Sequence, residues 1–255
     1  MTPPVFVLRT DDLADATIGC IVRVSGEEGR HAATVRRVEP GEIINLVDGH
    51  GRRVTGTVST VIDRQTIDVD VVAVRDEPVP ALRVVVVQAL TKGDRGELAV
   101  EQLTQIGVDE ILPWSAAHSV VQWRGDRAAK SARRWADAAT AAAKQSRRAR
   151  FPLMGRLAST DDVRDRIGAA STAIVLDESA SASIGEIDVP AAGELLIVVG
   201  PEGGISGDER AAFAAAGAQI VRMGPTVLRA SSAGLAAVAV LLSSTPRWSS
   251  DAVEG

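Results

Sequence analysis

Residues 195–232 read LLIVVGPEGGISGDERAAFAAAGAQIVRMGPTVLRASS, and this stretch decides how the second half of the chain folds. Its apolar, β-branched start at 195–199 predicts a strand buried on both faces. The Gly-Pro-Glu-Gly-Gly loop that follows leads into a helix, which Ser206 and Glu209 begin with capping-box spacing. Residues 219–223 predict another short strand with a second glycine turn after it. Two tight turns after two strands favour a ligand site, and a plain strand-turn-helix unit is the alternative because short glycine motifs have many false matches.

The last apolar run predicts the helix that closes this region. Residues 233–242 carry no polar side chain, but the run is shorter than the ~20 apolar residues that cross a bilayer. We therefore expect a helix buried on all sides, with Ser231 or Ser232 as its N-cap. Its free backbone N–H groups open beside the second glycine turn, where they can bind a carboxylate or the polar edge of a heterocycle.

The first part of the chain has a different periodicity. Short alternating runs separated by turn residues predict a small β-barrel or sandwich in residues 1–75, with helical character only at 31–37. Residues 76–81 contain two prolines and predict a linker. The expected strands of the first part are 5–8, 21–24, 42–47, 53–61 and 66–74.

From residue 82 onward strands and helices alternate, which predicts a mostly parallel sheet covered on both faces. No G-x-G-x-x-G motif follows the first of these strands and there is no P-loop lysine, so dinucleotide and nucleoside-triphosphate sites are disfavoured. The expected elements are strands at 84–87, 110–112 and 172–176, a helix from Asp94 and Glu97 to Gly107, and a long helix over 126–148.

Composition excludes several classes of protein. The chain has 255 residues, 45% of them hydrophobic, which is enough for one large or two modest domains with a real core. A single cysteine, Cys20, excludes an intramolecular disulfide framework and fits a reducing compartment. The first residues show neither a basic segment nor a long apolar segment, so we expect a cytoplasmic protein without a membrane anchor. The three histidines and the cysteine lack metal-ligand spacing, and we expect no metal site.

The distribution of charge favours a nucleic-acid partner although the net charge of −5 does not. Residues 124–150 hold nine basic and only two acidic side chains and end in QSRRAR. Such a basic element on an acidic protein can bind phosphate, and arginine offers bidentate contacts that lysine does not. The alternative is a helix face that is simply solvated.

Five segments in order resemble one known family. They are Val5-Phe6-Val7 with Arg9, the stretch from His31 to Glu42, Gln88-Ala89-Leu90 with Lys92, the A-x-Q-S-x-R pattern at 143–148, and the GPEGG loop with MGPTVLRASS. Together they are similar to the SPOUT (trefoil-knot) RNA methyltransferases, and within that group to the RsmE-type enzymes. The chain departs from the pattern at Ser231 and Gln105, where many relatives carry Glu, so no role of an acid is expected at either position.

The resemblance implies a fold and a reaction. It implies a small N-terminal β-barrel (PUA-like) domain at 1–75, an α/β methyltransferase domain with a knotted parallel sheet at 82–248, and a flexible tail at 249–255. It implies S-adenosylmethionine as cofactor, N3 of a uridine in 16S rRNA or the small ribosomal subunit as target, and a homodimer. The alternatives are a knotted ribose 2′-O-methyltransferase, which shares the GPE motif, and a non-catalytic RNA-binding protein.

The resemblance also implies three sets of site residues. Arg229 is a candidate for holding phosphate or stabilising a uracil oxyanion. Glu202 is a candidate proton acceptor, or else a structural carboxylate that caps backbone N–H groups. The expected cofactor contacts are Leu176, Asp177, Gly200, Glu202, Gly203, Gly204, Met223, Gly224, Pro225, Leu228, Ser231 and Ser232, among which the apolar side chains have core packing as the alternative. The expected RNA contacts are Arg9, His31, Arg36, Lys92, Gln145, Arg147 and Arg148.

Overall fold

The computed structural model describes residues 2–248, and the expected flexible tail at 249–255 lies outside them. The chain divides into two compact units. Unit 1 contains the residues up to Val79 together with Ala143–Phe151, and unit 2 contains Pro80–Ala142 and the chain from Pro152 onward. The boundary near residue 80 lies within the expected linker, whereas the assignment of Ala143–Phe151 differs from the expected domain at 82–248.

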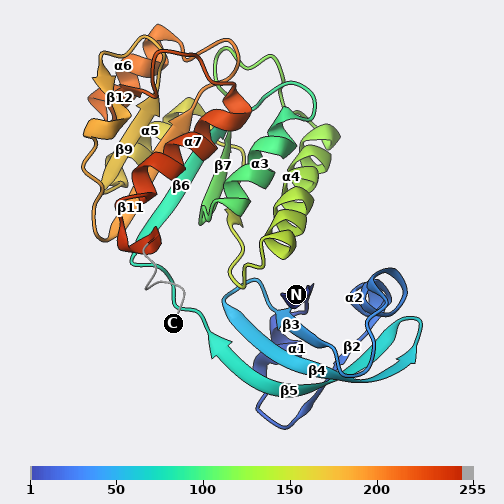
Figure 1. Cartoon of the computed structure of the whole chain (residues 1–255). Helices are drawn as coiled ribbons and strands as arrows, with labels where there is room; N and C mark the ends of the chain where they lie inside the picture. The colour runs from blue at the N-terminus through green and yellow to red at the C-terminus, as the bar shows by residue number, and fades with distance from the viewer. Residues whose placement is uncertain (1, 249–255) are drawn as a thin grey trace. The chain divides into compact units, whose positions relative to one another are not determined.

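Unit 1 is built on a five-stranded sheet with the strand order β1-β3-β4-β5-β2. β1 and β3 pair in parallel and the other neighbours pair antiparallel, with the long hairpin β4–β5 in the middle (Figure 1). The strands are β1 (Val5–Val7), β2 (Ile21–Val24), β3 (Ile43–Val47), β4 (Arg52–Asp63) and β5 (Thr66–Asp76). The expected strands are all present, and the sequence did not predict the short helices α1 (Thr10–Ala14) and α2 (Gly26–Arg30). The helical stretch expected at 31–37 is a π-helix, η1 (His31–Arg36).

The alternating strand pattern places one set of apolar side chains on a single face of this sheet. They form a core with Leu13 of α1 and Ala32 of η1, because each inward residue alternates with an outward one along its strand. The largest fully buried members of this core are Phe6, Leu13, Ile44, Leu46 and Ile67.

The segment Ala143–Phe151 belongs to unit 1 because its side chains and backbone bond there. The Lys144 ammonium lies 2.6 and 2.9 Å from the two carboxylate oxygens of Glu28. Gly51 donates its N–H to the carbonyl of Ala149, and Phe151 donates to the carbonyl of Gly49. These contacts tie the end of helix α4 (Asp126–Gln145) and the residues after it to the β-sheet unit.

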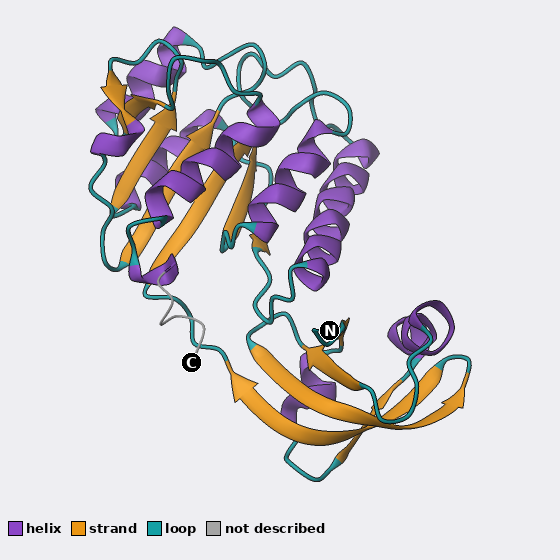
Figure 2. Ribbon diagram, in the orientation of Figure 1, coloured by secondary structure: helices purple, strands orange, loops and turns teal. Residues whose placement is uncertain are grey.

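Unit 2 is a seven-stranded sheet in which every pair of neighbours is parallel (Figure 2). Its strand order is β10-β12-β9-β11-β6-β7-β8. The strands are β6 (Leu82–Ala89), β7 (Glu110–Trp114), β8 (Leu153–Met154), β9 (Thr172–Leu176), β10 (Ala182–Ser183), β11 (Gly193–Val199) and β12 (Gln219–Arg222). The helices are α3 (Arg95–Gln105), α4, α5 (Thr160–Ala169), α6 (Gly207–Ala215) and α7 (Ala230–Leu242), with 3-10 turns η2 (Ile184–Glu186) and η3 (Pro246–Trp248).

Helices cover both faces of this sheet, as the continuous apolar strands require. Val84, Val86 and Ile197 pack with α3, α4 and α7 on one face, and Val85 and Val198 pack with α5 and α6 on the other. The expectation that α7 is buried on all sides is wrong. Helix α7 packs on α3, β6, β11, η2 and η3, but it is not fully buried, because Val240 is 43% exposed.

The ends of the helices test the expected caps. Ser206 and Glu209 form the capping box of α6, since the Ser206 hydroxyl accepts the Glu209 N–H and the Glu209 carboxylate accepts the Ser206 N–H. The N-cap of α7 is Arg229, so the expectation that Ser231 or Ser232 caps this helix is wrong. The helix begins at Ala230, which places both serines inside its first turn, past the position from which a hydroxyl can cap.

Candidate functional site

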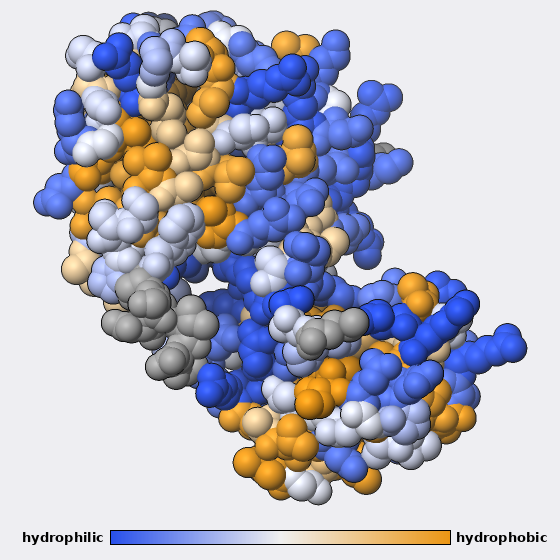
Figure 3. Space-filling model, viewed as in Figure 1, coloured by the Kyte–Doolittle hydropathy of each residue, from blue (hydrophilic) through white to orange (hydrophobic). Residues whose placement is uncertain are grey.

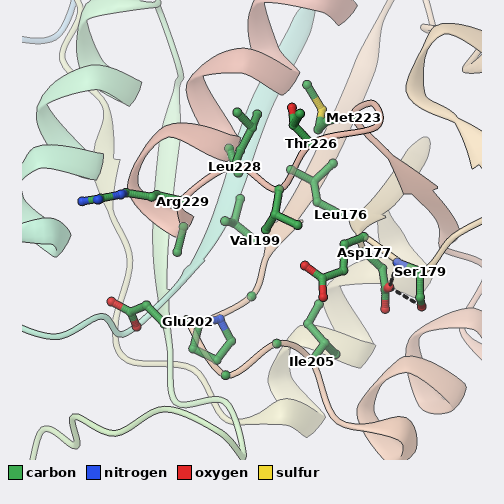
Figure 4. Close-up of a pocket in the computed structure, with 18 of the residues that line it drawn as sticks. Leu176, Asp177, Ser179, Val199, Glu202, Ile205, Met223, Thr226, Leu228 and Arg229 are labelled. Atoms are coloured by element: carbon green, nitrogen blue, oxygen red, sulfur yellow. Dashed lines mark hydrogen bonds between the residues drawn. The ribbon is translucent and has the colours of Figure 1, made fainter.

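Three loops meet where parallel strands of unit 2 end. They follow β9, β11 and β12, which lie side by side in the sheet, so their carboxyl ends share one edge. The loops enclose a cavity of about 560 Å³ (Figure 4). We call this cavity the pocket, and residues 200–205 the GPEGG loop. The loop after β12 leads directly into α7, whose first residue also lines the pocket.

The pocket has an apolar wall. The side chains that form it come from the three strand ends and from the loop before α7, and Figure 4 shows them around one common space. They are Leu176, Val199, Ile205, Met223 and Leu228. Leu176 and Met223 also pack against the core on the α7 face of the sheet, so they serve as core and wall together. An aromatic heterocycle fits such a wall, because most ligand pockets combine apolar sides with a few polar groups.

Asp177 supplies a fixed negative charge at one side of the pocket. Its Oδ1 accepts the Ser179 N–H at 2.8 Å and the Ser179 hydroxyl at 2.6 Å, and Arg210 lies 3.4 Å from Oδ2. Burial alone raises the pKa of Asp177, but the Ser179 hydrogen bonds and Arg210 outweigh it and hold the pKa below its ordinary value. The carboxylate is therefore ionised at neutral pH and can accept hydrogen bonds from a ligand.

Glu202 lies at the opposite side, in the middle of the GPEGG loop. Its Oε1 accepts a hydrogen bond from the Arg95 guanidinium at 3.1 Å and one from the Lys92 N–H at 3.4 Å. Arg95 is the first residue of α3 and Lys92 lies in the loop between β6 and α3, so Glu202 ties the GPEGG loop to the segment that follows β6. Glu202 thus accepts one backbone N–H and one guanidinium N–H, and both contacts hold the GPEGG loop in place.

Arg229 lines the pocket at the start of α7. Its guanidinium is exposed and forms no ion pair with the residues that the structure describes. In Figure 4 it extends away from Leu176 and Val199, on the side of the pocket where Glu202 lies. A charge in this position is available to a ligand that reaches beyond the apolar wall.

The structure brings most of the expected cofactor contacts together. Leu176, Asp177 and Leu228 line the pocket with the glycines at 200, 203, 204 and 224, and so do Glu202 and Met223. Pro225, Ser231 and Ser232 do not line it. Ser231 is buried in the first turn of α7, where it packs inside the fold.

The expected RNA contacts fall mainly in unit 1. Arg9 and Arg36 are exposed, His31 is half-buried and packs edge-on against Phe6, and Lys92 is the one candidate that belongs to unit 2. The other three lie in the segment Ala143–Phe151, and they are Gln145, Arg147 and Arg148. Arg147 is exposed with a left-handed backbone (φ 60°), whereas Arg148 is half-buried.

Several residues at the pocket were missed by sequence reasoning. Ser179 had a readable signal, because Asp-x-Ser spacing is typical of a local Asx turn. Arg95 and Arg210 had none, since each reaches the pocket from the first turn of a helix whose orientation only the tertiary fold sets. The further lining residues are Glu178, Val199, Pro201, Thr226, Val227, Ala230 and Ala233.

Within residues 2–248, no group of three or more His, Cys, Asp or Glu side chains is arranged to hold a metal ion. In the same part of the chain, no helix has both the length and the apolar character that a membrane crossing requires.

Comparisons with known proteins agree along nearly the whole chain. A family model described as an RNA methyltransferase domain matches residues 77–242, and one described as an RNA methyltransferase PUA domain matches residues 24–72. The chain is 44% identical over 248 residues to "Ribosomal RNA small subunit methyltransferase E" of Mycobacterium bovis, an alignment that covers 95% of this chain and 93% of that protein.

Solved structures show the same fold. The structure of a ribosomal RNA small subunit methyltransferase E from Neisseria gonorrhoeae, bound to S-adenosyl methionine, superposes with a TM-score of 0.82 at 26% identity and covers 95% of this chain and 98% of that one. A Legionella pneumophila structure in complex with the cofactor SAM gives a TM-score of 0.83 at 23% identity over 96% of this chain and 99% of that one. At that identity the second likeness shows the fold alone.

Proposed function

The chain belongs to the RNA methyltransferase family, and on this premise we propose that it transfers a methyl group from S-adenosylmethionine to N3 of a uridine in small-subunit ribosomal RNA. The membership confirms the expected fold class, a PUA-like domain followed by a parallel-sheet methyltransferase domain. Ribosomal RNA of the small subunit follows from the end-to-end likeness to the Mycobacterium bovis enzyme. The choice of N3, and the knotted path of the chain, rest on the sequence resemblance.

The pocket carries the proposal. Its volume of about 560 Å³ suits a nucleoside-sized ligand, because cofactor pockets typically measure ~300–1,000 Å³. The wall formed by Leu176, Val199 and Leu228 fits the adenine ring, and the Asp177 carboxylate fits hydroxyl or ammonium donors. Gly204 has φ +75° with open space beside its Cα, so the backbone there approaches a ligand without a side chain.

Different residues of the pocket have different roles in methyl transfer. S-adenosylmethionine, when bound, supplies a methyl group that its sulfonium has already activated. The chain must then hold donor and target in line and stabilise the uracil as N3 loses its proton. We assign the second task to Arg229, whose guanidinium can face the developing negative charge. We assign Glu202 to loop positioning, because Arg95 and the Lys92 N–H already hold its Oε1.

Nucleoside analysis tests this function against its alternatives. Small-subunit rRNA that lacks the modification is incubated with the chain and labelled S-adenosylmethionine, digested to nucleosides and analysed by mass spectrometry. We expect label in a base-methylated uridine. Label in a ribose 2′-O-methyl nucleoside instead favours the related knotted enzymes, and RNA binding without any label favours a non-catalytic binding protein. Parallel reactions with free rRNA and assembled subunits identify the form of the substrate.

We propose further that the chain acts as a homodimer in the cytoplasm. The dimer is supported by apolar side chains that stay exposed on and before α7, among them Val227 and Val240, and Figure 3 shows apolar residues gathered over this part of unit 2. Burying such surface stabilises an interface by roughly 25 cal/mol per Å². Sedimentation at micromolar concentration should show a dimer. The cytoplasm is supported by the single cysteine and by the ribosomal target.

A further inference from the structure

His118 touches the GPEGG loop from outside the pocket. It lies in the loop after β7, and its Nδ1 is 3.1 Å from the carbonyl oxygen of Gly203 and 3.2 Å from that of Gly204. Both glycines line the pocket, whereas His118 does not. Because a carbonyl oxygen can only accept, the Nδ1 atom must carry the proton in this contact. The contact therefore exists with the neutral Nδ1–H tautomer and with the cation, but not with the other neutral tautomer.

The loop that carries His118 is itself fixed. The N–H of the preceding residue, Ala117, donates to Oε1 of Glu209 at 2.7 Å, and Oε2 of the same buried carboxylate closes the capping box of α6. Burial alone raises the pKa of Glu209, but the backbone N–H groups of Ala117 and Ser206 and the hydroxyls of Ser206 and Thr160 outweigh it and lower the pKa. An ionised, fully bonded carboxylate thus anchors the residue beside His118.

The absence of a side chain at Gly203 belongs to the same arrangement. A Cβ atom there would lie 3.0 Å from the Cβ and 3.3 Å from the carbonyl oxygen of His118. Both distances are shorter than ordinary van der Waals contact, so a larger residue would push the two loops apart. Gly203 is therefore small because His118 packs against it, and the close approach brings Nδ1 within hydrogen-bond distance of two carbonyls.

The orientation of these carbonyls sets the orientation of the next N–H. In a trans peptide the carbonyl and the following N–H point in opposite directions. When the Gly204 carbonyl faces His118, the N–H of Ile205 must face away from it. Ile205 lines the pocket, and its N–H makes no hydrogen bond with any residue between 2 and 248. A free backbone donor in a residue that lines the pocket is suited to a ligand acceptor such as a ring nitrogen or a hydroxyl oxygen.

We propose that His118 is a positioning residue for the cofactor: its Nδ1–H holds the Gly203 and Gly204 carbonyls on the outer side of the GPEGG loop and so keeps the Ile205 N–H directed into the pocket. The inference rests on the proposed function, because it explains how the loop is shaped for S-adenosylmethionine. It assigns His118 no contact with the methyl group or the target base. The expected signature is a change in cofactor affinity and KM, not in kcat.

Two nearly isosteric substitutions separate hydrogen bonding from packing. In His118→Asn the amide can place an N–H close to the position of Nδ1, whereas His118→Asp has the same shape and offers only acceptors. We expect His118→Asn to bind S-adenosylmethionine within about twofold of the wild type. A third variant, His118→Ala, removes the ring and should bind about 3- to 10-fold more weakly, the range for one net hydrogen bond. The Asp variant should bind about 10-fold more weakly or worse, because its carboxylate faces two carbonyl oxygens.

Titration calorimetry with S-adenosylmethionine on the full chain measures these affinities, and thermal melting of each variant checks the fold. The pair His50→Asn and His50→Asp is the matched control, since His50 is an exposed histidine of unit 1. At saturating cofactor the Asp variant should keep a kcat near that of the wild type. Nitrogen-15 spectra, in which only three histidines contribute, should show His118 protonated at Nδ1 at neutral pH.

The outcomes distinguish this inference from the proposed function. Equal affinities for the Asn and Asp variants, or a neutral His118 protonated only at Nε2, overturn the positioning role while the function stands. A loss of kcat in the Asp variant at saturating cofactor also overturns it, because His118 would then act in the reaction itself. A wild-type chain that does not bind S-adenosylmethionine overturns the proposed function and this inference together.

Discussion

The pocket of unit 2 and the segment Ala143–Phe151 of unit 1 both carry charged side chains in or beside turns. They differ in how many of these charged groups already have a partner within the fold. At the pocket, Arg229 has no ion-pair partner among residues 2–248, and Oε2 of Glu202 accepts no hydrogen bond in that range. In the segment, Lys144 is bonded to Glu28 through both carboxylate oxygens, and Arg150 donates to the carbonyl of Glu77 at 2.6 Å.

This difference between unpaired charges at the pocket and paired charges in the segment affects how a cluster of basic residues should be interpreted. A run such as QSRRAR predicts phosphate binding only if its guanidinium groups remain available, and the fold itself competes for them. Within the segment, Lys144 and Arg150 hold unit 1 together, while the backbone carbonyl of Arg147 accepts a hydrogen bond from Arg53 and its side chain stays exposed. The two regions thus differ in what substitution should damage: ligand chemistry at the pocket and folding stability in the segment.

The largest effect is expected for Arg229→Ala. If this guanidinium stabilises negative charge on the uracil, methyl transfer should slow by ~10²–10³ while affinity for S-adenosylmethionine changes little. Raising the pH should partly restore the rate, because more uridine is then ionised at N3, and Arg229→Lys should retain part of it. Single-turnover kinetics across pH measure both. A variant that sediments as a monomer, or that loses affinity and rate equally, would show that Arg229 maintains the assembly and not the reaction.

Gly203→Val should give the next largest effect, a loss of affinity for S-adenosylmethionine at the pocket. The new side chain would meet His118 at distances where the loops must shift, so we expect S-adenosylmethionine to bind about 10- to 100-fold more weakly, as overpacking typically costs. Gly203→Ala should lie in between. Gly207→Ala is the matched control, since a Cβ there meets nothing within 4 Å and Gly207 does not line the pocket. Unchanged affinity in the Val variant would remove the GPEGG loop from the site.

Gly203 shows how much of the site the sequence predicts and how much it does not. Local patterns predicted strand β9, the capping box of α6 and the glycine loops correctly, because a β-branched run, a cap or a turn acts through neighbouring residues. The sequence indicated that Gly203 is required but gave a ligand as the reason. The structure adds the contact with His118, 85 positions away along the chain, which no local pattern encodes.

The errors have the same physical cause. The start of α7 was misplaced because the loop after β12, and not a serine hydroxyl, sets where the helix begins. The two-residue strands β8 and β10 were missed because only pairing with a distant strand makes them strands. The grouping of Ala143–Phe151 with unit 1 could not be read from the sequence either, because the segment continues a helix of unit 2 and its ion pair with Glu28 spans 116 positions.

Lys144→Met tests whether the charges of the segment Ala143–Phe151 contribute to folding stability. The substitution keeps the aliphatic stem and removes the ammonium, so Glu28 retains only its hydrogen bond from the Val7 N–H. We expect the free energy of unfolding to fall by about 2 kcal/mol, the range for a hydrogen bond to a charged group. Urea denaturation measures it. Lys130→Met, on an exposed position of the same helix, should change stability by less than ~0.5 kcal/mol. Cofactor affinity should be unaffected by either variant.

Arg147→Gln tests whether an exposed arginine of the segment Ala143–Phe151 contacts RNA or only serves the fold. If this exposed guanidinium contacts an RNA phosphate, its loss should weaken RNA binding and reduce the slope of log affinity against log salt concentration by about 0.7 to 0.9. Glutamine preserves a polar side chain of similar length at this left-handed backbone position. Arg164→Gln is the control, because Arg164 already pairs with Asp161 and Asp165 on α5. An unchanged slope would remove Arg147 from the expected RNA contacts.

The smallest effect is expected at Asp177, where the pocket resembles the segment because a charge is held by its own neighbours. Its pKa is lowered in the folded state, so its ionised form stabilises the fold above the pKa of the unfolded chain, and this contribution is lost as the pH falls through the folded-state pKa. Asp177→Asn should therefore be less stable than the wild type at pH 7, and the difference should shrink as the pH falls below about 4. Chemical denaturation without S-adenosylmethionine at a series of pH values measures it. Glu178→Gln, an exposed neighbour on the same loop, controls for removing one negative charge. A difference that stays constant down to the lowest pH would mean that the ionised form of Asp177 does not contribute to stability, and that the amide disturbs the turn for a reason other than the lost charge.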